Sequence, residues 1–198
     1  MKTLIMFGRS PFVPTVDVDR LISLYDTMGF NNFASHYPVT TSWCVDAYVK
    51  PMSDRTEVFG RVDRPGQYPE GVTLIQPLIY PYPLVPERRD PTNNALELGW
   101  RKFSPCLGIN WAILQGYTDI CFVGIDHVPT DTKFKHFDGI DNKHGQNMSE
   151  LMHTRFREYV ENATKHIRIW QTNPAVRQYW NLPFRSIEKV YSGFRLRD

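Results

Sequence analysis

Hydrophobic residues along this chain fall into short runs that polar, turn-forming segments separate. Residues 3–7 and 120–125 are almost wholly apolar, which is typical of strands buried on both faces of a parallel sheet. Residues 40–49 are rich in β-forming residues and residues 72–79 hold another apolar run, so we predict strands there too. Residues 51–70 are polar and rich in Gly and Pro, which predicts a loop or a short excursion of the chain.

Other segments show apolar residues at helical spacing. This spacing predicts a helix over residues 16–28 with Gly29 as its C-cap. A second helix is expected to start at Ser104-Pro105, because Ser suits the N-cap and Pro suits the first helical position. Residues 148–170 are expected to form a long amphipathic helix or a helix that runs into a strand.

Strand, loop and helix in this order are typical of nucleotide-binding α/β folds. We therefore predict an α/β protein: a single Rossmann-like domain over residues 1–198, with a mainly parallel sheet flanked by helices. Residues 128–147 form a long polar stretch without periodicity, which we interpret as a lid-like loop. Residues 171–198 form a basic part rich in aromatic residues.

Composition places the chain among soluble globular proteins. Of its 198 residues 41 % are hydrophobic and 22 % are charged, which excludes a disordered or collagen-like chain. The three cysteines are widely spaced and form no CxxC pair, so a disulfide framework is not expected. No apolar run has the length of a signal peptide or a membrane span. We expect a cytoplasmic protein.

The net charge of +2 is spread unevenly along the chain. Residues 1–99 carry 9 Lys and Arg against 11 Asp and Glu, whereas residues 151–198 carry 9 against 4. This excess favours an anionic partner such as a nucleotide phosphate, a nucleic acid or membrane headgroups. A solvated basic face is the alternative interpretation.

Two places on the chain suit an anion. After the first predicted strand, Gly8, Arg9 and Ser10 offer backbone N–H groups, a hydroxyl and a cation to a phosphate. The helix start at Ser104 and Pro105 offers free N–H groups and a partial positive charge. The simpler explanation is a turn for the first place and ordinary helix capping for the second. The chain contains neither a GxxxxGK[ST] loop nor a GxGxxG loop.

Candidate acid–base residues follow the apolar strand at 120–125. Asp126 lies where open α/β sheets place ligand groups, although a turn or cap role is the alternative. His127, His136 and His144 lie in or beside the long polar stretch, where a neutral imidazole can act as a general base. HExxH and GxSxG are absent, so neither a metal site nor a hydrolase elbow is predicted.

Three segments together resemble the bacterial sialyltransferases of glycosyltransferase family 42 and related bacterial and phage glycosyltransferase-like proteins. The main match is residues 103–126, where six positions fall in register with the family: Ser104, Gly116, Tyr117, Gly124, Ile125 and Asp126. Phe137-Asp138 follows at nearly the family's distance. Residues 29–33 are similar to the family's Cys-Asn-Gln-Phe, whose Asn contacts the nucleotide sugar.

The resemblance implies a GT-A-like variant of the fold and an enzyme that moves a sugar from a nucleotide-sugar donor to an acceptor hydroxyl. The transfer would be inverting and metal-independent, with no cofactor besides the donor. His144 matches the family's general base best, His153 is the competing candidate, and Asp126 joins them as a catalytic residue. The implied substrate-binding residues are Gly8, Arg9, Ser10, Asn31, Asn32, Ser104, Pro105, Gly124, Ile125, His127, Phe137 and Asp138.

The first loop departs from the family pattern. The family has Gly-Asn-Gly-Pro-Ser where this chain has Gly8-Arg9-Ser10-Pro11. The Asn that helps to bind donor phosphates is absent, and Arg9 is the substitute cation. A donor other than CMP-sialic acid is therefore compatible with the loop.

The acceptor stays open at this point. A glycan fits the resemblance, and the basic, aromatic C-terminal part also suits a hydroxylated DNA base. Two other classes compete with a glycosyltransferase: a non-catalytic nucleotide- or nucleic-acid-binding protein on the same fold, and a nucleotide pyrophosphokinase-like transferase. The pattern does not fix the oligomeric state.

Overall fold

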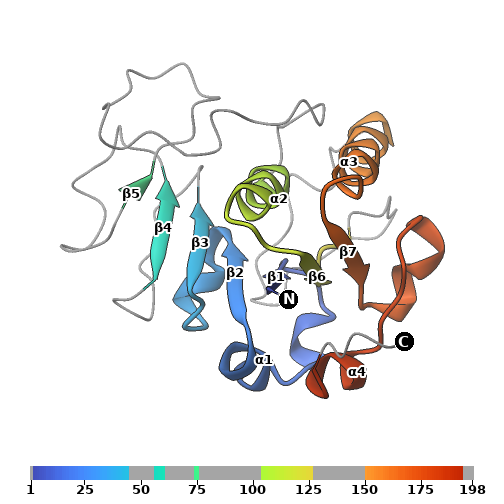
Figure 1. Cartoon of the computed structure of the whole chain (residues 1–198). Coiled ribbons are helices and arrows are strands. Elements are labelled where there is room, and N and C mark those ends of the chain that lie inside the picture. The colour runs from blue at the N-terminus through green and yellow to red at the C-terminus, as the bar shows by residue number, and fades with distance from the viewer. Residues whose placement is uncertain (1, 45–55, 61–73, 76–103, 127–149, 194–198) are drawn as a thin grey trace.

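One parallel sheet organises the protein (Figure 1). The computed structural model describes residues 2–44, 56–60, 74–75, 104–126 and 150–193. Within them the strands are β1 (Thr3–Phe7), β2 (Asp26–Phe30), β3 (Thr41–Cys44), β4 (Glu57–Gly60), β5 (Leu74–Ile75), β6 (Asp119–Val123) and β7 (Arg168–Gln171). Their order is β5-β4-β3-β2-β1-β6-β7, and every pair is parallel. The predicted α/β class with a mainly parallel sheet is confirmed.

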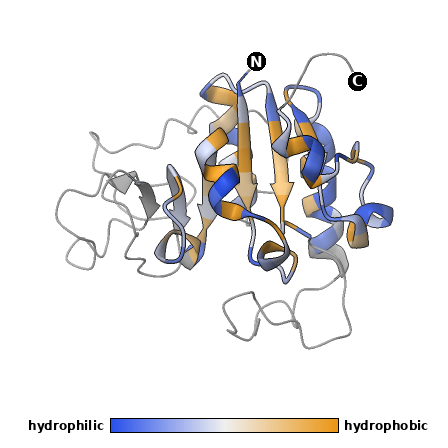
Figure 2. Cartoon of the chain, turned by 90° about the horizontal axis from the view of Figure 1, so that it is seen from below, coloured by the Kyte–Doolittle hydropathy of each residue, from blue (hydrophilic) through white to orange (hydrophobic). Residues whose placement is uncertain are grey.

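Central strand β1 explains how the sheet is covered. Its side chains alternate, so that Leu4 and Met6 belong to one hydrophobic core cluster and Ile5 and Phe7 to another. All four are fully buried, which requires helices on both faces of the sheet. Figure 2 shows hydrophobic residues gathered in the central strands, whereas the surrounding helices carry both hydrophobic and hydrophilic residues.

Helices form a layer on each side of the sheet. They are α1 (Val18–Leu24), α2 (Ser104–Leu114), α3 (Glu150–Ala163) and α4 (Ile187–Tyr191), with 3₁₀ helices at Val13–Thr15, Asn31–Ser35 and Pro174–Tyr179. Figure 1 places α2 and α3 on one face and α1 and α4 on the other. The Tyr159 hydroxyl on α3 donates to the Cys106 carbonyl on α2 at 2.8 Å, and the Tyr25 hydroxyl beside α1 donates to the Val190 carbonyl on α4 at 2.6 Å.

The α2 helix begins at Ser104, where its start was predicted, and ends just before Gly116. Gly116 takes a left-handed conformation with φ of 74°. Its N–H donates to the Ile113 carbonyl and the N–H of Tyr117 donates to the Ala112 carbonyl, each at 3.0 Å. This pair of bonds is the Schellman motif, which glycine permits. The chain then enters β6 at the amino edge of the sheet.

The helix predicted over residues 16–28 is wrong in its second half. The α1 helix ends at Leu24, and β2 begins at Asp26. Met28 pairs in register with Met6 of β1 and is fully buried, so parallel pairing with the central strand overrides the helical spacing. Gly29 is therefore a strand residue and not a C-cap. A Cβ there would lie 2.8 Å from the Phe33 ring.

The loop predicted over residues 51–70 is also wrong in part, because β4 lies within it and pairs with β3. Of the two predicted strands beside it, residues 40–49 contain β3 and residues 72–79 contain β5. Residues 45–49 and 76–79 lie outside the described part of the chain.

The later segments follow the second of the two alternatives. Within residues 148–170 the helix α3 runs into the strand β7, so the prediction of a helix that leads into a strand is confirmed. The polar stretch at 128–147, interpreted as a lid, lies outside the described residues. No helix in the described part of the chain is long and apolar enough to cross a membrane.

Candidate functional site

The strand order creates a topological switch point between β1 and β6 at the carboxyl edge of the sheet. From β1 the chain adds β2 to β5 on one side and then returns to add β6 and β7 on the other side. The next described α-helix after β1 is α1, on one face of the sheet, and the next one after β6 is α3, on the other face. Open α/β sheets bind their ligands at such a switch point. Gly8, Ser10, Gly124, Ile125 and Asp126 follow these two strands, so the fold brings together five predicted site residues.

Two glycines let these loops approach each other closely. The Gly8 N–H donates to the Val123 carbonyl at 2.9 Å, and the Ser10 N–H donates to the Gly124 carbonyl at 3.3 Å. A Cβ at Gly8 would lie 2.0 Å from the Gly124 carbonyl oxygen. Gly124 itself has a φ of 73°, which disfavours a side chain. Both positions therefore need glycine for the backbone geometry of the site.

Asp126 is a buried carboxylate with spare hydrogen-bonding capacity. It is 7 % exposed. Its Oδ2 accepts a 2.9 Å hydrogen bond from the Nδ2 amide of Asn173, whereas Oδ1 has no hydrogen-bond partner of good geometry among the described residues. Burial raises the pKa of Asp126 above its ordinary value, and the side chains of Ser10 and Asn173 partly oppose that shift. A buried acceptor without a partner is unfavourable and is suited to a ligand hydroxyl.

A hydrogen-bond network fixes the loop that carries Asp126. The Trp180 indole N–H donates to the Asp126 backbone carbonyl at 2.9 Å. Gln171 donates from Nε2 to the Ile125 carbonyl at 3.2 Å and accepts at Oε1 from the N–H of Asn173 at 3.2 Å. The ends of β6 and β7 are thereby joined through buried side chains.

Sequence reasoning missed these supporting residues. Neither Asn173 nor Trp180 is among the predicted site residues. Asn173 also caps the 3₁₀ helix at Pro174–Tyr179 by accepting from the Ala175 N–H at 3.0 Å. An Asn before Pro is an N-cap pattern, and it was the available sign of an ordered turn at the end of β7.

Asn31 lies at the same edge of the sheet, directly after β2. Its φ is 55°, and within the described part of the chain it is the one non-glycine residue with a positive φ. Asn tolerates this left-handed conformation better than most residues, and such conformations cluster at functional sites. Asn32 follows it in the 3₁₀ helix.

The start of α2 faces the same edge by topology. The helix connects to β6 at the amino edge of the sheet, and a helix that crosses back between parallel strands runs antiparallel to them. Ser104 and Pro105, both half-buried, stand at its opposite end. The N–H groups in the first turn of a helix have no partner within the helix and can stabilise an anion.

The other predicted residues are less closely tied to Asp126. Arg9 is half-buried in the loop after β1. His153 is 6 % exposed and shares the buried face of α3 with Phe156. The remaining five candidates lie outside the described residues: His127, His136, Phe137, Asp138 and His144.

Two arginines of the basic C-terminal part pack against aromatic rings, which its composition does not predict. Arg185 is 8 % exposed, and its guanidinium lies 4.5 Å from the Trp170 ring centroid. The guanidinium of Arg177 lies 5.0 Å from the Phe184 ring centroid. Aromatic packing of this kind stabilises cations within the fold. Arg185 is therefore packed within the fold and does not contribute to an open basic surface.

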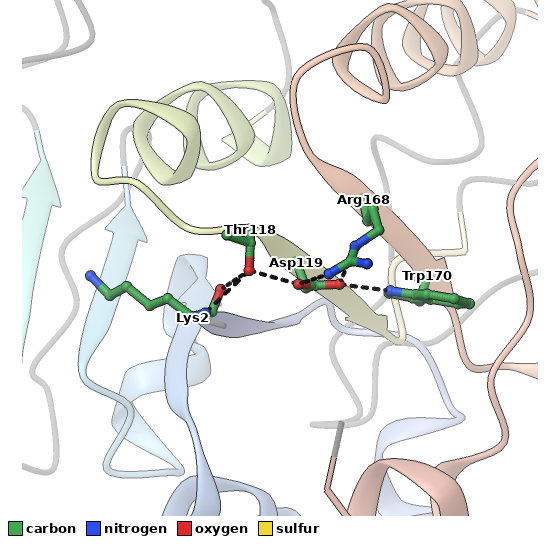
Figure 3. A network of polar contacts seen from close by, with 5 residues as sticks. All are labelled: Lys2, Thr118, Asp119, Arg168 and Trp170. Carbon is green, nitrogen blue, oxygen red and sulfur yellow. Dashed lines mark hydrogen bonds and ion pairs between the residues drawn. The ribbon is translucent and has the colours of Figure 1, made fainter. Parts of the chain in front are cut away.

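A second polar cluster stands at the opposite, amino edge of the sheet (Figure 3). Asp119 is 1 % exposed and forms an ion pair with Arg168 at 2.9 Å. It also accepts hydrogen bonds from the Thr118 hydroxyl at 2.7 Å and the Trp170 indole at 3.3 Å. Both carboxylate oxygens are therefore occupied, so this cluster joins β6 to β7 and offers no free acceptor. Among the described residues, no group of three or more His, Cys, Asp and Glu side chains is arranged to hold a metal ion.

Comparison with known proteins finds similarity at the level of structure only. No protein-family model and no curated protein matches the chain. A crystal structure of the sialyltransferase CST-II in complex with trisaccharide acceptor and CMP is similar, with 14 % identity and a TM-score of 0.48. The alignment covers 92 % of this chain and 86 % of that one.

Two further sialyltransferase structures are similar to the same extent. A mutant of alpha-2,3/8-sialyltransferase CstII has 12 % identity and a TM-score of 0.48, over 92 % of this chain and 86 % of that one. A CST-II variant in complex with CMP has 12 % identity and a TM-score of 0.46, over 93 % and 86 %. The predicted resemblance to sialyltransferases thus recurs in the structure comparison. At TM-scores below 0.5 it adds no weight to any assignment of chemistry.

Proposed function

We propose that the protein is a glycosyltransferase that binds a nucleotide sugar at the carboxyl ends of β1 and β6. The observation that carries this proposal is the buried Oδ1 of Asp126 at the switch point of the sheet, which has no hydrogen-bond partner among the described residues. A carboxylate oxygen held there accepts a hydrogen bond from a hydroxyl of the donor's ribose or sugar. The Ser104–Asp126 segment, which resembles the family in sequence, supplies both the carboxylate and the helix end.

The leaving phosphate needs a site that stabilises negative charge. The free N–H groups at the start of α2 carry a partial positive charge, and Arg9 and Ser10 follow β1 at the same edge. In this proposal they bind the phosphates, which lets the phosphate leave without a divalent cation. The negative charge of the leaving phosphate thus develops next to hydrogen-bond donors that the fold already orients.

A general base completes the reaction. His144 removes the proton from the acceptor hydroxyl as its oxygen forms a bond to the anomeric carbon. The bond from that carbon to the phosphate oxygen breaks at the same time, so the configuration inverts. His153 is the competing base. Both assignments rest on the sequence resemblance.

Donor binding is the first experiment. A thermal-shift screen of nucleotide sugars should raise the Tm of the wild-type chain, because a ligand that binds only the folded state stabilises it. The Asp126→Ala variant should lose most of that shift. The matched control is Glu188→Ala on α4, whose exposed side chain lies on the other face of the sheet. Absence of a shift with every nucleotide sugar would contradict the proposal.

Catalysis is tested separately with the donor identified in the screen. Hydrolysis or transfer should continue in EDTA and should fall at least about a hundredfold in His144→Ala, the usual size of a lost general base. His166→Ala removes an exposed imidazole at the end of α3 and should keep full activity. Full activity of His144→Ala with a loss in His153→Ala would move the base to His153. A strict magnesium requirement with pyrophosphate transfer would instead support the pyrophosphokinase-like alternative.

A further inference from the structure

An open groove of about 450 Å³ runs along α3, next to the candidate site. One wall is a stripe of α3 at i, i+3, i+4 and i+7 spacing, which places Thr154, Arg157, Glu158 and Glu161 on one face of the helix. The other wall is the end of the 3₁₀ helix and the turn after it, with Tyr179, Trp180 and Asn181. Neither the fold nor the proposed donor site accounts for this groove.

The wall formed by Trp180 connects the groove to Asp126. The Trp180 ring packs edge-on against Phe122 of β6 and Phe156 of α3, with centroid distances of 6.1 and 5.6 Å. Its indole N–H donates to the Asp126 carbonyl at 2.9 Å. One rigid side chain therefore separates the groove from the loop that carries the unpartnered carboxylate. A molecule in the groove would lie beside a sugar bound at Asp126.

The groove presents side chains that suit a sugar. Tyr179 is 41 % exposed, an unusual exposure for a large aromatic residue. Its flat ring can pack on the C–H face of a pyranose, as aromatic side chains do with apolar surfaces. The carboxylates of Glu158 and Glu161 and the amide of Asn181 supply acceptors and a donor for hydroxyl groups around that ring.

Charge decides between a glycan and a nucleic acid. Glu158 and Glu161 are exposed and carry two negative charges along one wall. Among the described residues that line the groove, Arg157 is the one cation. Its guanidinium donates to the Thr154 hydroxyl at 3.4 Å. A polyanion is repelled by an acidic wall, because nucleic-acid binding depends on neutralising phosphates with cations.

We infer that this groove binds a neutral glycan and that it is the acceptor subsite. The inference rests on the proposed function, whose acceptor it names. It assigns the hydroxyl-bearing substrate to the face formed by α3 and Tyr179, and it excludes a hydroxylated DNA base from this face.

Glycan binding is measurable without any donor. The full-length chain is applied to a glycan array that carries neutral, sialylated and sulfated glycans, and the strongest neutral binder is then titrated in solution by NMR. Tyr179→Ala should weaken its affinity about tenfold, the size of one lost aromatic contact. Glu158→Ala combined with Glu161→Ala should weaken it to a similar degree.

Matched controls separate the groove from general damage to the fold. Leu24→Ala removes another exposed apolar side chain, 49 % exposed, from α1 on the other face of the sheet. Glu188→Ala removes an exposed carboxylate from α4. Both controls should keep glycan affinity, and all variants should keep the Tm of the wild type within a few degrees.

The possible outcomes distinguish failure of the acceptor subsite from failure of the proposed function. Binding of neutral glycans that weakens in the groove variants, and stays in the controls, supports the inference. Binding of sulfated glycans or single-stranded oligonucleotides in place of neutral glycans overturns it, as does glycan binding that the groove variants leave unchanged. A chain that binds nucleotide sugars but no glycan keeps the proposed function and loses the acceptor subsite. A chain that binds neutral glycans through the groove but no nucleotide sugar loses the transferase function and keeps the glycan site.

Discussion

The Nδ2 amide of Asn173 donates a 2.9 Å hydrogen bond to Oδ2 of Asp126, which joins the carboxyl ends of β7 and β6. Residues 47 positions apart in the sequence are thus in contact in the centre of the candidate site. The bond orients the carboxylate, whose Oδ1 has no hydrogen-bond partner in the part of the chain that the structure describes. Burial of this carboxylate costs stability in the unliganded protein, because the side chains of Asn173 and Ser10 compensate only part of its lost hydration.

We predict that Asp126→Asn stabilises the protein at neutral pH while it weakens donor binding. Burial raises the pKa of Asp126, so the folded state binds this proton more tightly than the unfolded state does. Stability from this group is therefore greatest below its ordinary pKa of 3.8 and is lost as the pH rises through the raised folded pKa. The uncharged amide of the Asp126→Asn variant does not titrate, so this variant has no such loss of stability at neutral pH. The gain should be on the order of 1 kcal/mol, or about 2–4 °C in Tm for a chain of this size.

The pH dependence provides the check on this explanation. The Tm of wild type and Asp126→Asn should differ most at pH 7–8 and should converge as the pH falls towards 3.8. A constant difference across this range would show that titration of Asp126 is not the cause. A variant that is less stable than wild type at neutral pH would contradict the prediction directly.

Asn173 offers a second test of the same contact. Asn173→Ala removes the donor to Asp126 and the cap of the 3₁₀ helix at Pro174–Tyr179. The loss should destabilise the protein by about 1–3 kcal/mol, because a buried carboxylate loses its hydrogen bond and a helix end loses its cap. Chemical denaturation measures this difference. Asn173→Asp keeps the cap and places a second carboxylate beside the first, so it should be destabilising at pH 7 and much less so in acid.

Much of the fold follows from local sequence patterns, and the exceptions have physical causes. The apolar runs in β1 and β6 identify buried strands directly. Met28 fits a helical face equally well, and only pairing with Met6 of a neighbouring strand decides for β2. In β4 the apolar run is only two residues long, Val58 and Phe59, so its place in the sheet depends on pairing with β3.

The site shows the same limit of prediction. Gly8, Ser10 and Asp126 could be predicted because a residue at the end of a buried strand has a known place in an α/β sheet. Asn173 and Trp180 act on Asp126 from 47 and 54 positions away. Their role depends on how β7 and the following turn pack on β6, and no local pattern contains that information.

The two close glycines provide a prediction about backbone geometry. Gly8→Ala should destabilise the protein severely, by more than about 3 kcal/mol, because the new Cβ would lie 2.0 Å from the Gly124 carbonyl oxygen. The control is Gly116→Ala, where nothing lies within 4 Å and only the positive φ is unfavourable. That control should cost about 1–2 kcal/mol. Urea denaturation of both variants tests the ranking, and equal losses would contradict it.

The two ends of β6 give opposite predictions for the same substitution. Asp119 accepts hydrogen bonds at both oxygens, from Thr118 and Arg168 at Oδ2 and from Arg168 and Trp170 at Oδ1. An Asn can accept at only one of these atoms and would turn its NH₂ group towards donors. Asp119→Asn should therefore destabilise the protein by about 1–3 kcal/mol, whereas Asp126→Asn should stabilise it.

Donor binding should separate the two ends as well. Asp119 lies at the amino edge of the sheet, away from the candidate site, so Asp119→Asn should keep the thermal shift caused by a nucleotide sugar. Asp126→Asn should lose most of that shift in spite of its higher Tm. Denaturation curves and ligand shifts on the same two proteins measure both effects. If both variants lost stability, the unpartnered Oδ1 would not be a cost to the fold. If both kept the ligand shift, Asp126 would not bind the donor.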